Sequence, residues 1–314
     1  MRLAFTIRKY NLELDVVPHD EIYHLDVTRG MTVLDALIRI KNEQDGRLTF
    51  RYSCRSAICG SCAMTINGAE KLACRTAVRK EWERHGGIAV GPLRHLPVLK
   101  DLAVDMRLFW SKVRAVEPWL RDEGRTASTA ARLMAGSAQF YNVDACIMCG
   151  ACVAACTVHE VDRGFLGPAA LAKAYRFVAD SREPGAARTA RLAALQGPTG
   201  MWDCTRCNFC VEVCPKDVQP MEAIIRLRRT AIEAGHIETG GARHVVGFRD
   251  LIARFGRLNE ALMPLKVIGP NVRRFLHVLP LGLRMLFKGK VPNPLHSPMD
   301  GPERVRALLE RNWR

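Results

Sequence analysis

The twelve cysteines of this 314-residue chain fall into three groups of four. The first group has the spacing C-x4-C-x2-C, with the fourth member after eleven more residues: Cys54, Cys59, Cys62 and Cys74. The other two groups share the spacing C-x2-C-x2-C-x3-C: Cys146, Cys149, Cys152 and Cys156, then Cys204, Cys207, Cys210 and Cys214. Because thiolate sulfur is the ligand that soft metal ions prefer, each group is a candidate metal site.

The spacings indicate iron–sulfur clusters rather than zinc or disulfides. The first is typical of plant-type [2Fe–2S] ferredoxins, and the repeated one is typical of bacterial two-cluster ferredoxins. A zinc ion needs two C-x2-C pairs, which gives no reason for four cysteines within eleven residues, twice over. The first residues, 1–8, alternate like a strand and hold no apolar run of secretory length. We therefore expect a reducing compartment, in which disulfides are rare.

The two repeated motifs are expected to share their ligands. In two-cluster ferredoxins the last cysteine of each motif binds the cluster of the other motif. This exchange predicts one [4Fe–4S] centre on Cys146, Cys149, Cys152 and Cys214. It predicts another on Cys156, Cys204 and Cys210, with Cys207 available as a fourth ligand. Since the exchange ties two distant segments together, we expect this domain to lose its fold without iron.

Three parts are expected to position these cysteines, in an α+β fold. Residues 1–100 form an N-terminal β-grasp [2Fe–2S] ferredoxin domain, residues 101–235 an α-helical dicluster ferredoxin domain, and residues 236–314 a basic helical extension.

Local signals support the first two parts. Residues 3–10 and 21–27 are strand-like, and Thr32 opens a helix through a capping box. The dicluster part contains an internal repeat, because each cysteine motif is followed by a helix that begins near a proline, Pro168 or Pro220.

The formal net charge of +15 suggests an anionic partner. The basic residues are spread along the chain, so lipid or an acidic protein is favoured over nucleic acid. No stretch approaches 18 uncharged apolar residues, so we expect no transmembrane helix.

Prolines such as Pro264 and Pro280 predict that the extension is broken into short pieces. Its apolar residues, flanked by Arg and Lys, either pack over the chain's own core or form an amphipathic surface on lipid headgroups or a membrane subunit.

Longer segments resemble the iron–sulfur subunit of succinate dehydrogenase and fumarate reductase. The resemblance covers about residues 1–232, and these segments carry it: 53–64, 96–106, 146–152, 167–182, 202–204 and 213–216. It implies a non-catalytic electron-transfer subunit of an oxidoreductase complex, with a [2Fe–2S] cluster near an FAD-containing flavoprotein subunit. A [4Fe–4S] cluster and a third centre near membrane quinone would follow. Membrane anchor subunits would hold the chain as a peripheral protein at the cytoplasmic face of the cell membrane.

Several positions depart from the family pattern around the third centre. That centre is usually [3Fe–4S] with a non-cysteine residue in place of Cys207, so here we predict [4Fe–4S], the alternative being a free buried thiol beside a three-iron cluster. Thr157 replaces a proline, and Thr205 replaces a histidine. The segment 158–161 replaces the tryptophan-bearing stretch of the quinone pocket, and we expect its His159 and Glu160 to lie in a solvated loop.

These departures leave a second function open. In it, the chain exchanges electrons with a thiol, a disulfide or another non-quinone carrier through a partner of the heterodisulfide-reductase type, whose tails the segment 279–292 resembles weakly. A third reading is a structural or nucleic-acid-binding metalloprotein.

Overall fold

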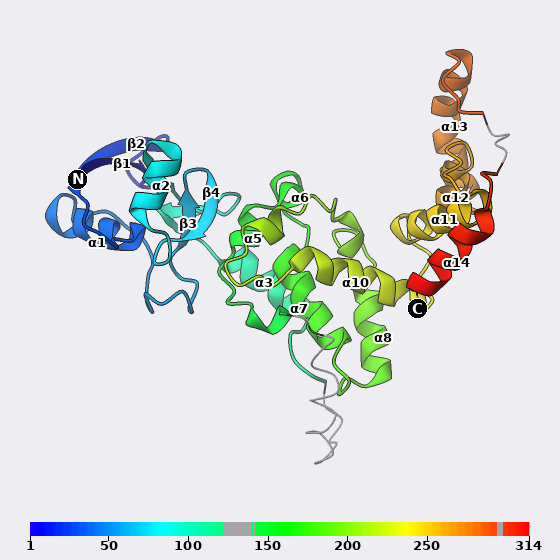
Figure 1. Ribbon diagram of the computed structural model, residues 1–314, viewed down its shortest axis with the longest axis horizontal. Coiled ribbons are helices and arrows are strands. Elements are labelled where there is room, and N and C mark those ends of the chain that lie inside the picture. The colour runs from blue at the N-terminus through cyan, green and yellow to red at the C-terminus, as the bar shows by residue number, and fades with distance from the viewer. Residues whose placement is uncertain (122–139, 141, 294–297, 314) are drawn as a thin grey trace. The chain divides into compact units, whose positions relative to one another are not determined.

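The computed structural model describes residues 1–121, 140, 142–293 and 298–313 (Figure 1). The chain divides into two compact units, Met1–Leu227 and Arg228–Arg314. The first unit contains all twelve cysteines. The division falls inside one helix, and the domain limits expected at residues 100 and 235 remain predictions.

The N-terminal part of the first unit is a mixed five-stranded sheet with a helix packed against it. Its elements are β1 (Arg2–Lys9), β2 (His19–Asp26), α1 (Val33–Glu43), β3 (Ala63–Ile66), β4 (Ala69–Leu72), α2 (Val78–His85) and β5 (Ile88–Gly91). The strand order is β2-β1-β5-β3-β4, with β1 and β5 parallel and the other neighbours antiparallel. This arrangement is the β-grasp that the sequence predicts.

Local sequence signals account for the ends of these elements. Thr32 forms the predicted capping box, since its Oγ1 accepts from the Asp35 N–H at 3.2 Å while its own N–H donates to the Asp35 carboxylate at 3.0 Å. Asn67 and Gly68 both have positive φ, as the tight turn between β3 and β4 requires. Phe5 and Ile7 of β1 are fully buried with Leu37 of α1, which places the core between sheet and helix.

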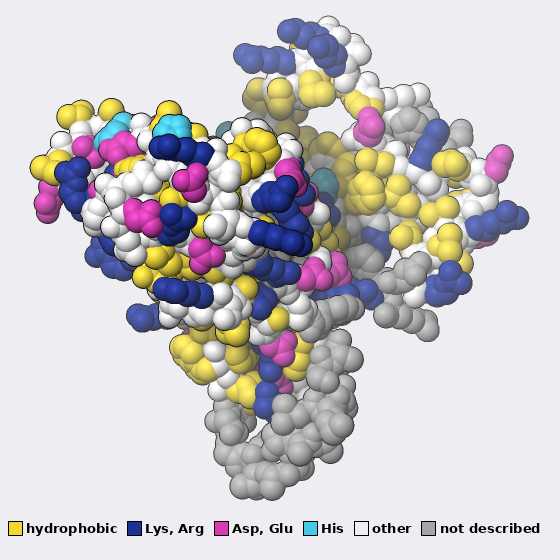
Figure 2. All heavy atoms as spheres, turned by 60° about the vertical axis from the view of Figure 1, so that its left-hand side comes forward, with side chains coloured by type: hydrophobic (Ala, Val, Ile, Leu, Met, Phe, Trp, Pro, Cys, Tyr) yellow, Lys and Arg dark blue, Asp and Glu magenta, His cyan; other side chains and the backbone are white. Residues whose placement is uncertain are grey.

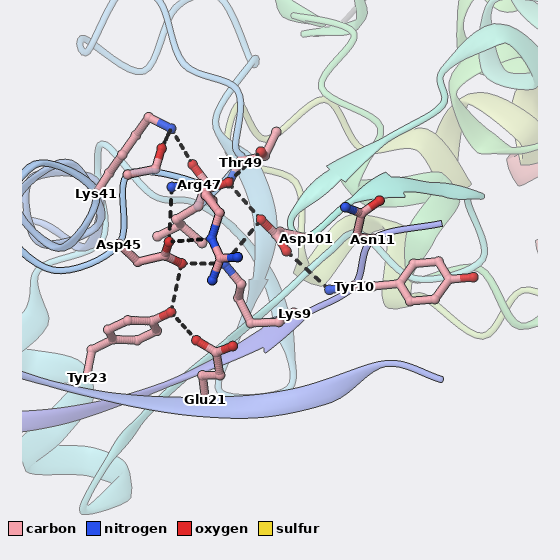
Figure 3. Close-up of polar contacts among 12 residues, drawn as sticks. Lys9, Tyr10, Asn11, Glu21, Tyr23, Lys41, Asp45, Arg47, Thr49 and Asp101 are labelled. Carbon is pink, nitrogen blue, oxygen red and sulfur yellow. Dashed lines mark hydrogen bonds and ion pairs between the residues drawn. The ribbon is translucent and has the colours of Figure 1, made fainter. Parts of the chain in front are cut away.

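A buried ion-pair network fixes the chain just before the first cysteine loop (Figure 3). Lys9 at the end of β1 places its Nζ 2.6 Å from Asp45 Oδ2 and 3.4 Å from Asp101 Oδ2. Asp101 also accepts from the backbone N–H groups of Thr49 at 2.8 Å and Tyr10 at 3.2 Å. Because all three charges are mutually satisfied, the network holds the loop entrance against the sheet.

The other described residues of the first unit are mainly helical, apart from a small hairpin. Its elements are β6 (Val98–Lys100), β7 (Ala103–Val104), α3 (Arg107–Ala115), η2 (Val143–Ala145), α5 (Ala151–Ala154), α6 (Thr157–Val161), α7 (Pro168–Val178), α8 (Gly185–Ala194), η3 (Met201–Asp203), α9 (Phe209–Glu212) and α10 (Pro220–Glu233). Helices α7 and α10 begin at the two prolines, as predicted. The N-terminal ferredoxin part and the helical part confirm the expected α+β fold.

In its described residues, the second unit consists of the end of α10 and four further helices. They are α11 (Gly240–Phe255), α12 (Met263–Ile268), α13 (Val272–Phe287) and α14 (Pro302–Trp313). The expectation of short pieces is wrong for α13, because Pro280 lies inside this sixteen-residue helix.

Among the described residues, no helix is both long and apolar enough to cross a bilayer. Figure 2 shows Lys and Arg side chains mixed with acidic ones over the visible face of the N-terminal part, as the scattered basic residues predict.

Candidate iron–sulfur centres

The first cysteine group lies at the end of the sheet. Cys54 and Cys59 are in the irregular loop before β3, while Cys62 and Cys74 flank the β3–β4 hairpin. The backbone N–H groups of Ser56, Ile58 and Cys59 point at Cys54 Sγ, at 3.4, 3.4 and 3.3 Å. Such converging N–H groups favour negative charge on sulfur.

Two thiols of this group, Cys62 and Cys59, have contrasting surroundings. Burial raises the pKa of Cys62 to about 12, and the nearby sulfurs of Cys74 and Cys59 add to the increase. In contrast, hydrogen bonds from Ser61 and from the Cys54 backbone lower the pKa of Cys59 to about 6. The structure therefore brings together all four residues predicted to hold the [2Fe–2S] cluster.

The exchange of ligands redefines the second group as Cys146, Cys149, Cys152 and Cys214, which joins three cysteines of one motif to the last cysteine of the other. Burial raises the pKa of Cys152 well above its usual value, and negative charge on Cys149, Cys146, Cys210 and Cys214 would raise it further. Burial also raises the pKa of Cys149 to about 11, with Cys146 and Cys214 contributing. Cys214 thus lies with the first motif, as the exchange of ligands predicts.

The third group is correspondingly Cys156, Cys204, Cys207 and Cys210, in which the last cysteine of the first motif joins three cysteines of the second. Burial raises the pKa of Cys210 to about 12, and Cys204, Cys156 and Cys207 lie close enough to add to the effect. Cys156, from the first motif, interacts in turn with Cys204 and Cys207. The second and third groups are neighbours, because Cys152 and Cys210 interact with each other.

The backbone of the two motifs repeats, which bears directly on Cys207. Each motif has a left-handed residue before its second cysteine and another after it: Met148 (φ 54°), Gly150 (φ 83°), Arg206 (φ 61°) and Asn208 (φ 73°). A short helix that carries the third cysteine follows, α5 in one motif and α9 in the other. Cys207 therefore occupies the backbone position that Cys149 occupies in the first motif.

The surroundings of Cys207 are polar. Its side chain is exposed, in contrast to the buried thiol considered as the alternative. Partial burial works against ionisation, but the Phe209 N–H and the hydroxyls of Thr157 and Thr205 outweigh it and lower the pKa of Cys207. The Thr157 hydroxyl donates to Cys207 Sγ at 3.7 Å.

These donor sets fit iron–sulfur clusters chemically. All twelve cysteines are free of disulfides. Most members of the second and third groups resist ionisation because they are buried beside one another, and bound iron would remove their protons by supplying positive charge. Within the described part of the chain, no three His, Cys, Asp or Glu side chains are arranged around a position for a single metal ion.

The first and second cysteine groups touch through their loops. Gly60 has φ +75°, and a Cβ atom built there would lie 2.8 Å from Cys149 Cβ and 3.0 Å from Cys149 Cα. Arg75, next to Cys74, donates from Nη1 to the carbonyl of Pro215, next to Cys214, at 3.0 Å. The cysteine spacing gives no sign of this contact between the two ferredoxin parts.

His159 is not in a solvated loop. It is 0% exposed in the short helix α6, with Nε2 3.1 Å from Lys112 Nζ, which also donates to the carbonyl of Phe165 at 2.5 Å. Burial, together with the Lys112 charge, lowers the pKa of His159 to about 4, so the imidazole is neutral at neutral pH and can accept from Lys112. Glu160 belongs to the same helix, and only its expected exposure to solvent is confirmed. The missed partner, Lys112, has no motif that could have revealed it.

Comparisons with known proteins agree with this geometry. Residues 4–111 match the family described as 2Fe-2S iron-sulfur cluster binding domain, and residues 142–218 match the 4Fe-4S dicluster domain. These two matches confirm the two ferredoxin parts expected from the cysteine spacing.

Relatives that align over most of their own length extend the comparison. The chain is 38% identical to a fumarate reductase iron-sulfur subunit of Escherichia coli O6:H1, over 71% of this chain and 90% of the relative. It is 40% identical to that of Mycobacterium tuberculosis, over 73% and 93%. It is 37% identical to the succinate dehydrogenase iron-sulfur subunit of Paracoccus denitrificans, over 73% and 88%. A chain of the Mycobacterium smegmatis Sdh1 complex in the apo form shares the fold, with a TM-score of 0.63 and 22% identity over 75% of this chain and 97% of that chain.

Replacing Gly60 tests the contact between the first two cysteine loops. We expect Gly60→Ala to destabilise the folded chain by at least about 2 kcal/mol, because it adds a backbone clash at Cys149 to the cost of a left-handed alanine. Gly68→Ala is the matched control, since Gly68 has φ +79° and open space at its Cβ position. Urea unfolding followed by circular dichroism measures both. Equal losses for the two variants would show that the loops do not press together at Gly60.

Proposed function

Because the chain belongs to the family of fumarate reductase and succinate dehydrogenase iron–sulfur subunits, we propose that it carries single electrons between a flavoprotein subunit and membrane quinone. As a member of this family it is a subunit of an oxidoreductase complex. The FAD of the partner subunit would perform the succinate or fumarate chemistry. Membrane anchor subunits would hold the complex, with this chain at the cytoplasmic face of the membrane.

This proposal rests on one observation, which is that each cysteine group lies next to the following one. The loop of the first group contacts Cys149 of the second through Gly60, and Cys152 of the second group interacts with Cys210 of the third. Bound clusters would supply one-electron oxidation and reduction at each group. Electrons could then pass along the first unit without leaving the cysteine groups.

The protein's own groups have defined tasks in such a relay. The cysteine thiolates hold the clusters, and the N–H groups around Cys54 stabilise added negative charge on the first one. Buried apolar residues such as Ala151 and Val153 lie beside the second group, where they limit the access of water. Hydrogen bonds and burial of this kind set cluster reduction potentials.

The third centre is proposed to be [4Fe–4S], with ligands Cys156, Cys204, Cys207 and Cys210. Two observations support a fourth ligand: Cys207 repeats the backbone position of Cys149, and it lies within electrostatic reach of Cys156 and Cys210. A fourth thiolate lowers the potential relative to a three-iron centre by adding negative charge. The hydroxyls of Thr157 and Thr205 act in the opposite direction, because they donate to the Cys207 sulfur.

Purification of the native complex under anaerobic conditions tests the electron-carrier function. We expect the chain to copurify with an FAD-containing subunit and membrane subunits, and the complex to reduce quinone with electrons from succinate. Electron exchange with a thiol or disulfide carrier, and none with quinone, would contradict the proposed acceptor. A preparation without a flavoprotein would contradict the function as a whole.

Electron paramagnetic resonance (EPR) distinguishes the two types of third centre. In the oxidised wild-type protein we expect no three-iron signal, because a [4Fe–4S] centre in its oxidised resting state has no unpaired spin. Cys207→Ala removes one ligand, so this variant should gain a three-iron signal that integrates to about one spin per chain. A strong three-iron signal in intact anaerobic wild-type protein, unchanged by the substitution, would refute ligation by Cys207.

A further inference from the structure

Helix α13 of the second unit has no partner within the described chain that buries it. All residues from Asn271 to Lys290 are exposed, including large apolar side chains such as Leu276, Leu279, Leu283 and Leu286. An apolar helix surface of this extent is costly in water and marks an interaction site. Figure 1 shows α13, in orange, extending beyond α11 and α12 of the same unit.

Most of the large apolar side chains of α13 lie on one face, whereas Val278, Leu281 and Met285 lie on the opposite side. Val272, Leu276, Leu279, Leu283 and Leu286 recur every three or four residues, which places them in a single stripe along the helix. Phe275 and Phe287 border this stripe near the two ends. At 100° per residue, the opposite face carries cations.

The cationic face has no acidic residue close to it in the sequence. It carries Arg273, Arg274, His277, Arg284 and Lys288, and Lys290 follows the helix. The sequence contains no Asp or Glu from residue 261 to residue 299. Long Arg and Lys side chains beside an apolar stripe can extend to negatively charged headgroups while the stripe enters the acyl boundary.

We propose that α13 lies flat in the headgroup region of an anionic lipid bilayer, with its leucine stripe buried and its cations on phosphate groups. Charge complementarity favours lipid over a second copy of this basic chain, because two copies would repel each other. The inference does not depend on the electron-carrier function, since it uses neither the cysteines nor a partner subunit. It would give the chain a membrane contact of its own.

Flotation with lipid vesicles tests this assignment on the full chain with its clusters assembled anaerobically. We expect the protein to float with vesicles of phosphatidylglycerol and phosphatidylcholine, and much less with phosphatidylcholine alone. Raising the salt concentration should weaken binding, because salt screens the cations. The double variant Leu279→Ser, Leu283→Ser should bind at least about tenfold more weakly, since each leucine contributes apolar burial.

Leu281→Ser is the matched control. Leu281 is 59% exposed, but it lies on the cationic face, between Arg274 and Lys288 in the helical projection. This variant should keep affinity within about threefold of wild type. Unchanged visible absorbance and elution volume would establish that all variants are folded. Absence of flotation with anionic vesicles, equal losses in the two variants, or binding only to vesicles that contain the membrane subunits would overturn the proposal.

Discussion

The exchange of cysteines between two motifs is the constraint on which the helical part of the first unit depends. Cys214 lies with the first motif and Cys156 with the second, so segments about sixty residues apart must stay together for either centre to exist. Without iron, these buried thiols resist ionisation, because burial and the charge on neighbouring thiolates both raise their pKa values. With iron bound, the same burial would form a low-dielectric shell around each centre, so we expect metal binding and folding to be coupled.

The proposed relay would be continuous, because two very different contacts join the three cysteine groups. Gly60 has no side chain, which allows the loop of the first group to rest against the backbone at Cys149. The second and third groups are adjacent because each contributes a cysteine to the other. The residues that depart from the family pattern meet at the third centre, where Thr157 and Thr205 both donate to Cys207. If Cys207 binds the cluster, as we propose, its thiolate and these donors would affect the reduction potential in opposite directions.

Local chemistry made much of this structure predictable. The capping box at Thr32 and the helices that begin at Pro168 and Pro220 depend only on neighbouring residues, and the cysteine spacing defines the sets that meet. Tertiary contacts were not predictable in the same way. Nothing near His159 in sequence indicates that Lys112 buries it, and Pro280 remains inside α13 although its sequence signal is that of a helix break. The burial of His159 depends on residues that the fold brings together, and no contact within the described chain explains why α13 continues past Pro280.

Analysis of iron, zinc and acid-labile sulfide in anaerobically purified protein tests the central claim most directly. One [2Fe–2S] and two [4Fe–4S] centres predict about ten iron atoms and about ten sulfides per chain, with a visible absorbance that dithionite bleaches reversibly. Colourless protein that contains zinc and no sulfide would contradict the account, because the same thiols would then hold single ions and no electron relay.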